Sequence, residues 1–339
     1  MELSTGTAGN QVAIQGRGVA ALCCKRLLPD AGFSLLPKAE NRSRVPAILL
    51  GERTQELLRD IYGRPELFRD LFQIDHRIVM WGRGSAPVEL PHRAVVVSEE
   101  ALAGMLKPEA CEERAADAAD WRVYASRPIP APVSERHFGS RRASATPVQL
   151  KGTRKSACWI ESLDSGWLFV VPESAAAGWL LAVGDSTGSL LAQSRLIAGQ
   201  VEISSDAEIA FPAHPRIADP LCAPGWLACG AAALGFDPLC GDGTGNAVRE
   251  AILAAAVIRA AIRGEHPERL LAHYRARLTA GLWRHLELCR SFYSSANCGP
   301  WWAGELARLE EGIAWCRRAL DAAPPFEYRL NGFDLEAVQ

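Results

Sequence analysis

Residues 225–262 read GWLACGAAALGFDPLCGDGTGNAVREAILAAAVIRAAI. This stretch predicts a short apolar strand at 226–229, then a loop rich in glycine, aspartate and proline, and then an alanine-rich helix from about Gly245. Because the helix has few charged residues, we expect most of its surface to be buried. Gly241, Gly243 and Gly245 precede the first full turn and leave the backbone free to approach a ligand closely. The unpaired N–H groups of a helix start suit an anionic or electron-rich ligand.

The same glycines also fit an ordinary strand–turn–helix junction, since short glycine patterns are weak evidence on their own. A second motif strengthens the ligand interpretation: residues 11–15 (QVAIQ) predict a strand, and residues 16–21 read G-x-G-x-x-A. A helix through Leu28 and a second strand at 33–36 complete a β–turn–α–β unit. In that setting the motif indicates a dinucleotide site, because the first glycine forms the turn and the second admits a pyrophosphate.

The rest of the chain predicts one antiparallel region followed by long helices. A loop rich in proline, arginine and serine at 127–145 leads into strands at 156–162, 167–172 and 179–183. Further strands are expected at 73–81 and 94–97, and helices from about Thr54 and at 99–106, 190–197, 266–292 and 301–320.

Composition excludes several classes of function. The chain has 339 residues, 48% of them hydrophobic, and a net charge of −2 without a basic run, so we expect no nucleic-acid partner. The start of the chain lacks the features of a signal peptide, and the most apolar window, 251–262, is too short to cross a bilayer. We therefore expect a cytoplasmic protein without membrane contacts.

The cysteines predict free thiols rather than disulfides or a metal site. There are ten, scattered along a chain with no C-x-x-C pair, and most are expected to be buried. The seven histidines are separate from one another and from cysteine pairs, so a structural zinc is not expected.

Taken together, the two glycine motifs resemble one superfamily, the FAD-dependent monooxygenases and flavin-dependent halogenases with a para-hydroxybenzoate hydroxylase-type fold. The late motif of that superfamily is similar to G-D-A-A-x-x-x-D-P-x-x-G-x-G, and residues 230–243 here read GAAALGFDPLCGDG. LLGERT at 49–54, GWLFVVPES at 166–174 and the segment 292–315 also resemble that superfamily, the last of them monooxygenases that oxidise tryptophan side chains during maturation of quinone cofactors.

The resemblance implies an α/β fold with an α+β insert: a Rossmann-like FAD-binding domain, an antiparallel-sheet substrate domain and C-terminal helices. We expect these at 1–106 with 220–265, at 107–219 and at 266–339. The FAD contacts carried over from the motifs are Gly16, Gly18, Val19, Ala21, Asp237, Pro238, Gly241, Gly243, Thr244, Gly245 and Asn246.

The implied activity is that of an FAD-dependent oxidoreductase of monooxygenase type. NAD(P)H or a flavin reductase would supply electrons, and the substrate would be aromatic, resembling tryptophan or a phenol, either small or bound to a peptide or carrier protein. The alternative is a degenerate member that keeps the fold without catalysis and serves as a binding or scaffold partner of another protein.

Departures from the superfamily pattern support that alternative. The acidic residue expected at the end of the second strand is replaced near Pro37 or Lys38, the aspartate of the late G-D pair is Ala231, and an expected arginine is Glu99. Each lost side-chain hydrogen bond is worth about 0.5–1.5 kcal/mol, so we expect FAD to bind weakly or exchangeably. Halogenation is not expected, because the W-x-W-x-I-P signature is absent and residues 39–106 contain no lysine.

Several side chains allow two interpretations, and no catalytic acid or base is identified. Thr244 and Asn246 contact the cofactor or are ordinary helix caps. Cys240 is redox-active or an inert buried thiol. Four tryptophans form either an aromatic substrate wall or part of the core: Trp167, Trp179, Trp301 and Trp302. Three arginines bind either an acidic carrier protein or a reduced nucleotide, or lie in a solvated loop: Arg136, Arg141 and Arg142.

Overall fold

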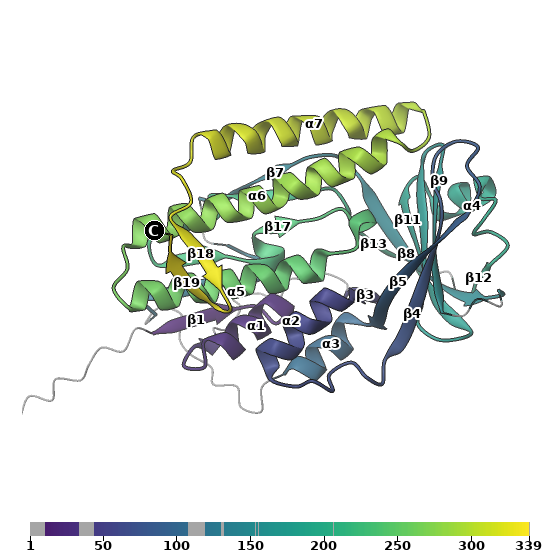
Figure 1. Cartoon of the computed structure of the whole chain (residues 1–339). Coiled ribbons are helices and arrows are strands. Elements are labelled where there is room, and N and C mark those ends of the chain that lie inside the picture. Colours follow the sequence, from purple (N-terminus) through teal and green to yellow (C-terminus); the bar gives the residue numbers. More distant parts are fainter. Residues whose placement is uncertain are drawn as a thin grey trace, which may run out of the picture.

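The computed structural model describes residues 11–33, 44–107, 119–129, 132–152, 154, 156–205 and 207–338. Pro37, Lys38 and the end of the expected second strand lie outside these ranges. Within them, no helix combines the length and the apolar character needed to cross a membrane. Two sheets and a set of long helices organise the described part of the chain (Figure 1).

A small, mostly parallel sheet holds the N-terminal glycine motif. In the described residues its strand order is β15-β16-β6-β1-β2, with β16, β6, β1 and β2 parallel and β15 antiparallel to β16. The bounds are β1 Val12–Gln15, β2 Gly32–Phe33, β6 Trp121–Tyr124, β15 Cys222–Ala223 and β16 Trp226–Ala228. The expected β–turn–α–β start is therefore present as far as Phe33, with α1 (Val19–Leu27) after the turn.

A larger sheet forms the end of the molecule opposite the C-terminal hairpin (Figure 1). Its described strands follow the order β12-β8-β11-β10-β9-β4-β5-β3, with β13 also on β8, and every pair is antiparallel except β4 with β9. The bounds are β3 Ile48–Gly51, β4 Phe72–Met80, β5 Val88–Val97, β8 Arg142–Leu150, β9 Ala157–Leu163, β10 Gly166–Pro172, β11 Ala177–Gly184, β12 Val201–Ile203 and β13 Ile209–Pro212.

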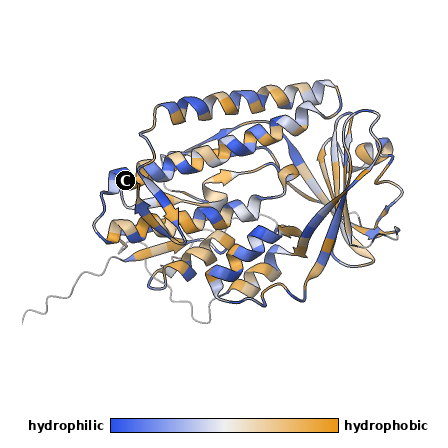
Figure 2. Ribbon diagram, viewed as in Figure 1, coloured by the Kyte–Doolittle hydropathy of each residue, from blue (hydrophilic) through white to orange (hydrophobic). Residues whose placement is uncertain are grey.

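Long helices cover these sheets. Helices α5 (Gly243–Ile262), α6 (Pro267–Ser294) and α7 (Pro300–Asp321) follow one another, and α6 and α7 run side by side along one side of the molecule (Figure 1). In Figure 2, hydrophobic and hydrophilic bands alternate along α7, as expected for a helix with one buried face. The remaining helices are α2 (Glu52–Tyr62), α3 (Glu99–Leu106) and α4 (Thr187–Gln193), with short helices η2 (Gly230–Ala232) and η3 (Pro238–Cys240).

Helix α5 is the buried element that the alanine-rich sequence predicts. Its buried residues run from Gly245 to Ala260, and α1, α2 and α6 all pack against it. The smaller elements are the sheet β17-β14-β7 and the C-terminal hairpin, with bounds β7 Ser134–His137, β14 Arg216–Asp219, β17 Leu234–Gly235, β18 Tyr328–Asn331 and β19 Asp334–Ala337.

The sheets divide the chain differently from the expected boundary at residue 106. Strands β3, β4 and β5 come before that boundary but pair within the large sheet, and β6 comes after it but lies between β1 and β16 in the small sheet. Strand pairing joins residues far apart in the chain, so the local sequence of a strand does not indicate which sheet it enters.

The helix expected at 190–197 is shifted: α4 starts at Thr187, where Ser186 caps it, and ends at Gln193. It stops because the next N–H groups turn toward a buried carboxylate. Glu161 on β9 is 0% exposed and accepts hydrogen bonds from the backbone N–H groups of Arg195 (2.8 Å), Leu196 and Ile197 (3.0 Å) and from the Ser194 hydroxyl.

Glu161→Gln is expected to lower the free energy of unfolding by about 1.5–3 kcal/mol, because an amide offers one acceptor oxygen where the carboxylate offers two charged ones. Chemical denaturation measures this loss. The matched control is Glu202→Gln on β12, where the side chain is 61% exposed and the change should stay within about 0.5 kcal/mol. Equal effects in both variants would contradict the role given to Glu161.

Candidate functional site

The fold brings the two glycine motifs together at Gly230. A methyl group built on Gly230 would lie 2.6 Å from the Cβ atom of Ala20 in the first turn of α1 and 3.9 Å from that of Ala247 near the start of α5. The N-terminal ends of α1 and α5 are therefore separated by little more than one small residue. Two helix N-termini beside each other present a concentrated set of N–H donors to an anionic or electron-rich ligand.

The predicted glycines divide into crowded and open positions. Gly16 has a φ of +126° and its Cβ position lies 3.0 Å from the Ser126 hydroxyl, while a Cβ on Gly245 would meet Thr54 Oγ1 at 2.5 Å, so both have structural reasons to be glycine. Among the described residues, Gly18 and Gly243 have open space around them, with no heavy atom within 4 Å of a built Cβ. Packing against the described residues does not explain these two glycines, and the space beside them is compatible with a bound ligand.

Helix α5 begins at Gly243, earlier than the sequence suggests. Its N-cap is Asp242, whose carbonyl accepts the Asn246 N–H at 2.9 Å. Thr244 and Asn246 thus lie inside the first turns, and the interpretation of either as the N-cap is wrong. The Asn246 side-chain oxygen accepts from Arg249 at 2.8 Å, and Arg249 also pairs with Asp242.

Asp237 is held by a buried ion network that the sequence did not indicate. Its carboxylate lies 2.9 Å from Arg141 Nε, accepts the Tyr293 hydroxyl at 2.8 Å and accepts the Leu239 N–H at 2.9 Å. Arg141 also pairs with Glu305 on α7. The carboxylate of Asp237 is therefore engaged within the protein.

Arg141 is the largest departure from the sequence interpretation. The sequence suggests a ligand contact or part of a solvated loop, but its side chain is 0% exposed and the residue lies immediately before β8. The Nε contact with Asp237 has the distance of an ion pair without the angle of a hydrogen bond, and in the described part of the chain Nη2 has no hydrogen-bond partner. Burial alone lowers the pKa of Arg141, but the nearby Tyr293, Asp237 and Glu305 outweigh it and raise that pKa.

The aromatic residues proposed as a substrate wall are partly core. Trp167 and Trp302 are 0% and 1% exposed, and their indole N–H groups donate to the Tyr293 hydroxyl and to the Leu163 carbonyl. Trp301 is half-buried and stacks on Tyr293 with ring centroids 6.0 Å apart. Trp81, which the sequence analysis did not include in this wall, packs edge-on against Trp302 with ring centroids 5.7 Å apart. Only the half-buried members of this cluster can offer a surface to a ligand.

Two of the three positions that depart from the superfamily pattern lie among the described residues and make hydrogen bonds within the protein. The carboxylate of Glu99 accepts the Val45 N–H at 2.8 Å, which ties α3 to the segment before β3. Ala231 is exposed in η2, and its carbonyl accepts from Arg216 at 2.6 Å. Neither position supplies the side-chain contact to FAD that the resemblance implies. The third, near Lys38, lies outside the described residues.

Glu250 is a buried acid at the junction of α1 and α5. Its Oε2 accepts the Gly230 N–H at 2.7 Å, and Oε1 has no hydrogen-bond partner among the described residues. Burial raises the pKa of Glu250 to about 8, and the Gly230 hydrogen bond and the arginines Arg249 and Arg216 offset this only in part. In the sequence, Glu250 is a charged residue within a helix that is expected to be mostly buried. A charge in such a helix was the one available sign of an unusual acid.

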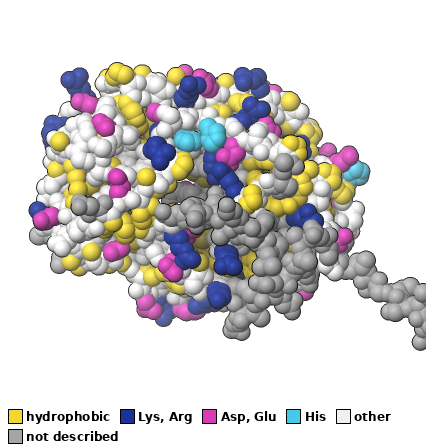
Figure 3. Space-filling model, turned by 180° about the vertical axis from the view of Figure 1, so that it is seen from behind, with side chains coloured by type: hydrophobic (Ala, Val, Ile, Leu, Met, Phe, Trp, Pro, Cys, Tyr) yellow, Lys and Arg dark blue, Asp and Glu magenta, His cyan; other side chains and the backbone are white. Residues whose placement is uncertain are grey.

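One face of the molecule is hollowed near its centre (Figure 3). Arginine or lysine, acidic and histidine side chains gather on the described part of its rim. The described part of the rim thus carries side chains of both charges, with hydrophobic side chains beside them.

Comparison with solved structures identifies proteins with a similar fold. The flavin-dependent halogenase CmlS matches with a TM-score of 0.73 and 18% identity over 93% of this chain and 72% of its own. The chain has the fold of flavin-dependent halogenases and monooxygenases. The peptidyl tryptophan dihydroxylase QhpG matches with a TM-score of 0.67 and 19% identity over 88% and 79% of the two chains. The p-nitrophenol 4-monooxygenase PnpA from Pseudomonas putida DLL-E4 matches at 0.65, with 14% identity over 91% and 98%.

No protein-family model matches the chain, and no curated protein sequence does so either. At sequence identities this low, the solved structures show that the fold is shared with this chain. They do not show that the reaction is shared, because one fold hosts many functions.

Arg141→Met is expected to lower the free energy of unfolding by about 3–5 kcal/mol, because it leaves two buried carboxylates without their cation. Chemical denaturation measures this loss. Arg142→Met is the matched control, since Arg142 is the exposed next residue, at the start of β8, and should change stability by about 0.5 kcal/mol at most. A similar small change in Arg141→Met would mean that the network is not an important part of the fold.

Glu250→Gln is expected to stabilise the protein by about 2 kcal/mol or more at pH 8, with the gain shrinking toward pH 4.5. The raised pKa means that the folded protein binds this proton more tightly than the unfolded chain. Wild-type stability should therefore fall as pH rises from about 4.5 to about 8, and glutamine removes that term. Denaturation over this pH range tests the slope, with exposed Glu310→Gln as control; parallel curves for all three proteins would contradict it.

Proposed function

We propose that the chain is an FAD-dependent oxidoreductase of monooxygenase type that acts on an aromatic substrate. The observation on which this rests is the meeting of two helix N-termini at Gly230, with open space at Gly18 and Gly243. The fold shared with flavin-dependent halogenases and monooxygenases supports the same proposal. The resemblance to QhpG, a peptidyl tryptophan dihydroxylase, favours a tryptophan-like or phenol-like substrate, free or held on a peptide or carrier protein.

The residues at the junction fit the two parts of FAD. Gly16, Gly18, Val19 and Ala21 would hold the pyrophosphate at the start of α1, where N–H groups and the helix dipole favour negative charge. Pro238, Gly241 and the first turn of α5, from Gly243 through Thr244 and Gly245 to Asn246, would face the flavin ring, and Asp237 would hold their loop in place through its carboxylate.

When bound, FAD supplies the redox chemistry with oxygen, and NAD(P)H or a flavin reductase supplies the electrons. The residues of the chain itself would position the cofactor and the substrate and exclude water. The dipole of α5 would stabilise negative charge at its N-terminus, and the half-buried Trp81 and Trp301 offer aromatic surfaces near the large sheet. Halogenation remains outside the proposal, since the sequence lacks the W-x-W-x-I-P signature and has no lysine at 39–106.

The second candidate is a non-catalytic binding protein with the same fold. It is favoured by Glu99 and Ala231, which are engaged within the protein instead of offering polar side chains to FAD. An absorption spectrum of the purified protein, repeated after addition of FAD and gel filtration, separates the two. Retained flavin bands support the enzyme, and NAD(P)H oxidation then becomes the next assay. If the protein retains no flavin and shows no thermal shift with excess oxidised or reduced FAD, the non-catalytic binding protein is the better account.

Gly18→Ala and Gly243→Ala are expected to weaken FAD binding at least about tenfold, equivalent to about 1.4 kcal/mol. The added methyl groups enter open space and should leave the melting temperature nearly unchanged, so the loss reports the ligand rather than the fold. Flavin fluorescence titration measures the affinity. Gly188→Ala in α4, which also has open space, is the control; unchanged FAD affinity in both junction variants would place the flavin elsewhere.

A further inference from the structure

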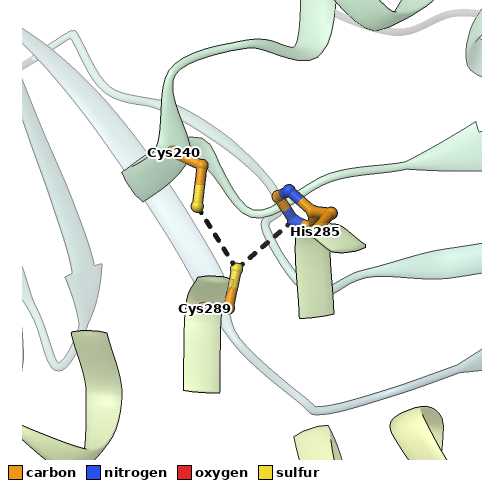
Figure 4. Close-up of side chains that lie close together, drawn as sticks. All are labelled: Cys240, His285 and Cys289. Atoms are coloured by element: carbon orange, nitrogen blue, oxygen red, sulfur yellow. Dashed lines mark hydrogen bonds between the residues drawn. The ribbon is translucent and has the colours of Figure 1, made fainter. Parts of the chain in front are cut away.

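Three potential metal ligands meet beside the candidate cofactor site. Cys240 ends η3, and His285 and Cys289 lie one turn apart on the same face of α6 (Figure 4). The Cys240 and Cys289 Sγ atoms are 3.5 Å apart, and Cys289 Sγ is 3.4 Å from His285 Nε2. The three donor atoms all lie within 4.8 Å of one another.

Two of these separations are close to the edges of a metal tetrahedron. With zinc–sulfur bonds of about 2.3 Å and zinc–nitrogen bonds of about 2.0–2.1 Å, tetrahedral angles place two sulfurs about 3.8 Å apart and a sulfur and a nitrogen about 3.6 Å apart. The two observed separations, 3.5 and 3.4 Å, need only a small expansion. The side chains in Figure 4 converge on one point instead of pointing away from one another.

We propose that Cys240, His285 and Cys289 bind Zn²⁺, with the fourth tetrahedral position open to water. Two thiolates and a neutral imidazole form a donor set typical of zinc, and binding would release the two thiol protons to solvent. His285 and Cys289 are buried, while Cys240 is half-buried.

The surroundings orient the imidazole for this role. The Asp237 N–H donates to His285 Nε2 at 2.9 Å, which makes Nε2 the unprotonated nitrogen, the form that binds a metal. The Phe236 ring packs edge-on against His285 with centroids 4.9 Å apart and fixes the plane of the ring. The metal would replace the Asp237 N–H at that lone pair, so loading should alter the loop at Asp237.

The neighbouring charges also favour a cation. The buried network beside the site has one cation, Arg141, against the two carboxylates of Asp237 and Glu305. The sequence did not predict this site, because Cys240 is distant in the chain from His285 and Cys289. The His-x-x-x-Cys spacing on a helix was the one signal available.

The test uses the full chain, reduced and freed of metal with a chelator, and titrated with Co²⁺ as a spectroscopic probe. We expect one equivalent to bind with visible d–d bands at longer wavelength than flavin absorption and with a thiolate-to-cobalt charge-transfer band, and Zn²⁺ to displace it. Cys240→Ser and Cys289→Ser should each weaken Co²⁺ binding by roughly 100-fold or more.

Cys298→Ser is the matched control, because Cys298 is an exposed cysteine outside the cluster, and it should bind Co²⁺ as the wild type does. Protection of Cys240 from alkylation by bound Zn²⁺, read by mass spectrometry, checks the site without a variant. No cobalt bands in the wild type, equal affinity in Cys240→Ser, or loss of binding in Cys298→Ser would overturn the proposal. A Cys240–Cys289 disulfide whose reduction yields no metal uptake would also overturn it and identify a redox pair instead.

Discussion

The charge of Arg141 has to be neutralised in a place without water, and much of the structure depends on how this is done. Its partners come from separate parts of the chain: Asp237 before η3, Glu305 on α7, and the Tyr293 ring on α6, which lies 4.9 Å from the guanidinium carbon. Removing such a group from water is costly, so the partners must stay in place together. The network thus fixes the large sheet, the two C-terminal helices and the loop before α5 relative to one another.

Asp237 connects this network to the candidate sites. Its carboxylate is held by Arg141, Tyr293 and the Leu239 N–H, while its own N–H donates to His285. The loop that leads into α5 is therefore positioned from both sides. A cofactor at the start of α5 and a metal ion at Cys240 would each act on the same short segment, so occupancy of one site is expected to influence the other.

Helix α5 supplies the second constraint. Its small residues let α1 and η2 approach closely, as Gly230 demonstrates between Ala20 and Ala247, and this proximity brings the two helix N-termini together. The same close packing excludes water from Glu250, whose raised pKa reflects burial without a paired cation. Close approach of backbones and an uncompensated buried acid are two consequences of one alanine-rich helix.

Local sequence determined a large part of this protein. The periodicity and glycine placement of 11–28 and 225–262 predicted α1 and α5, because backbone freedom and burial follow directly from residue type. What only the tertiary structure decided were the partners: which sheet β6 joins, that Arg141 is buried, and that Cys240 meets His285 and Cys289. These depend on contacts between residues distant in the chain, and neither the spacing nor the identity of a single residue specifies which distant group will lie beside it.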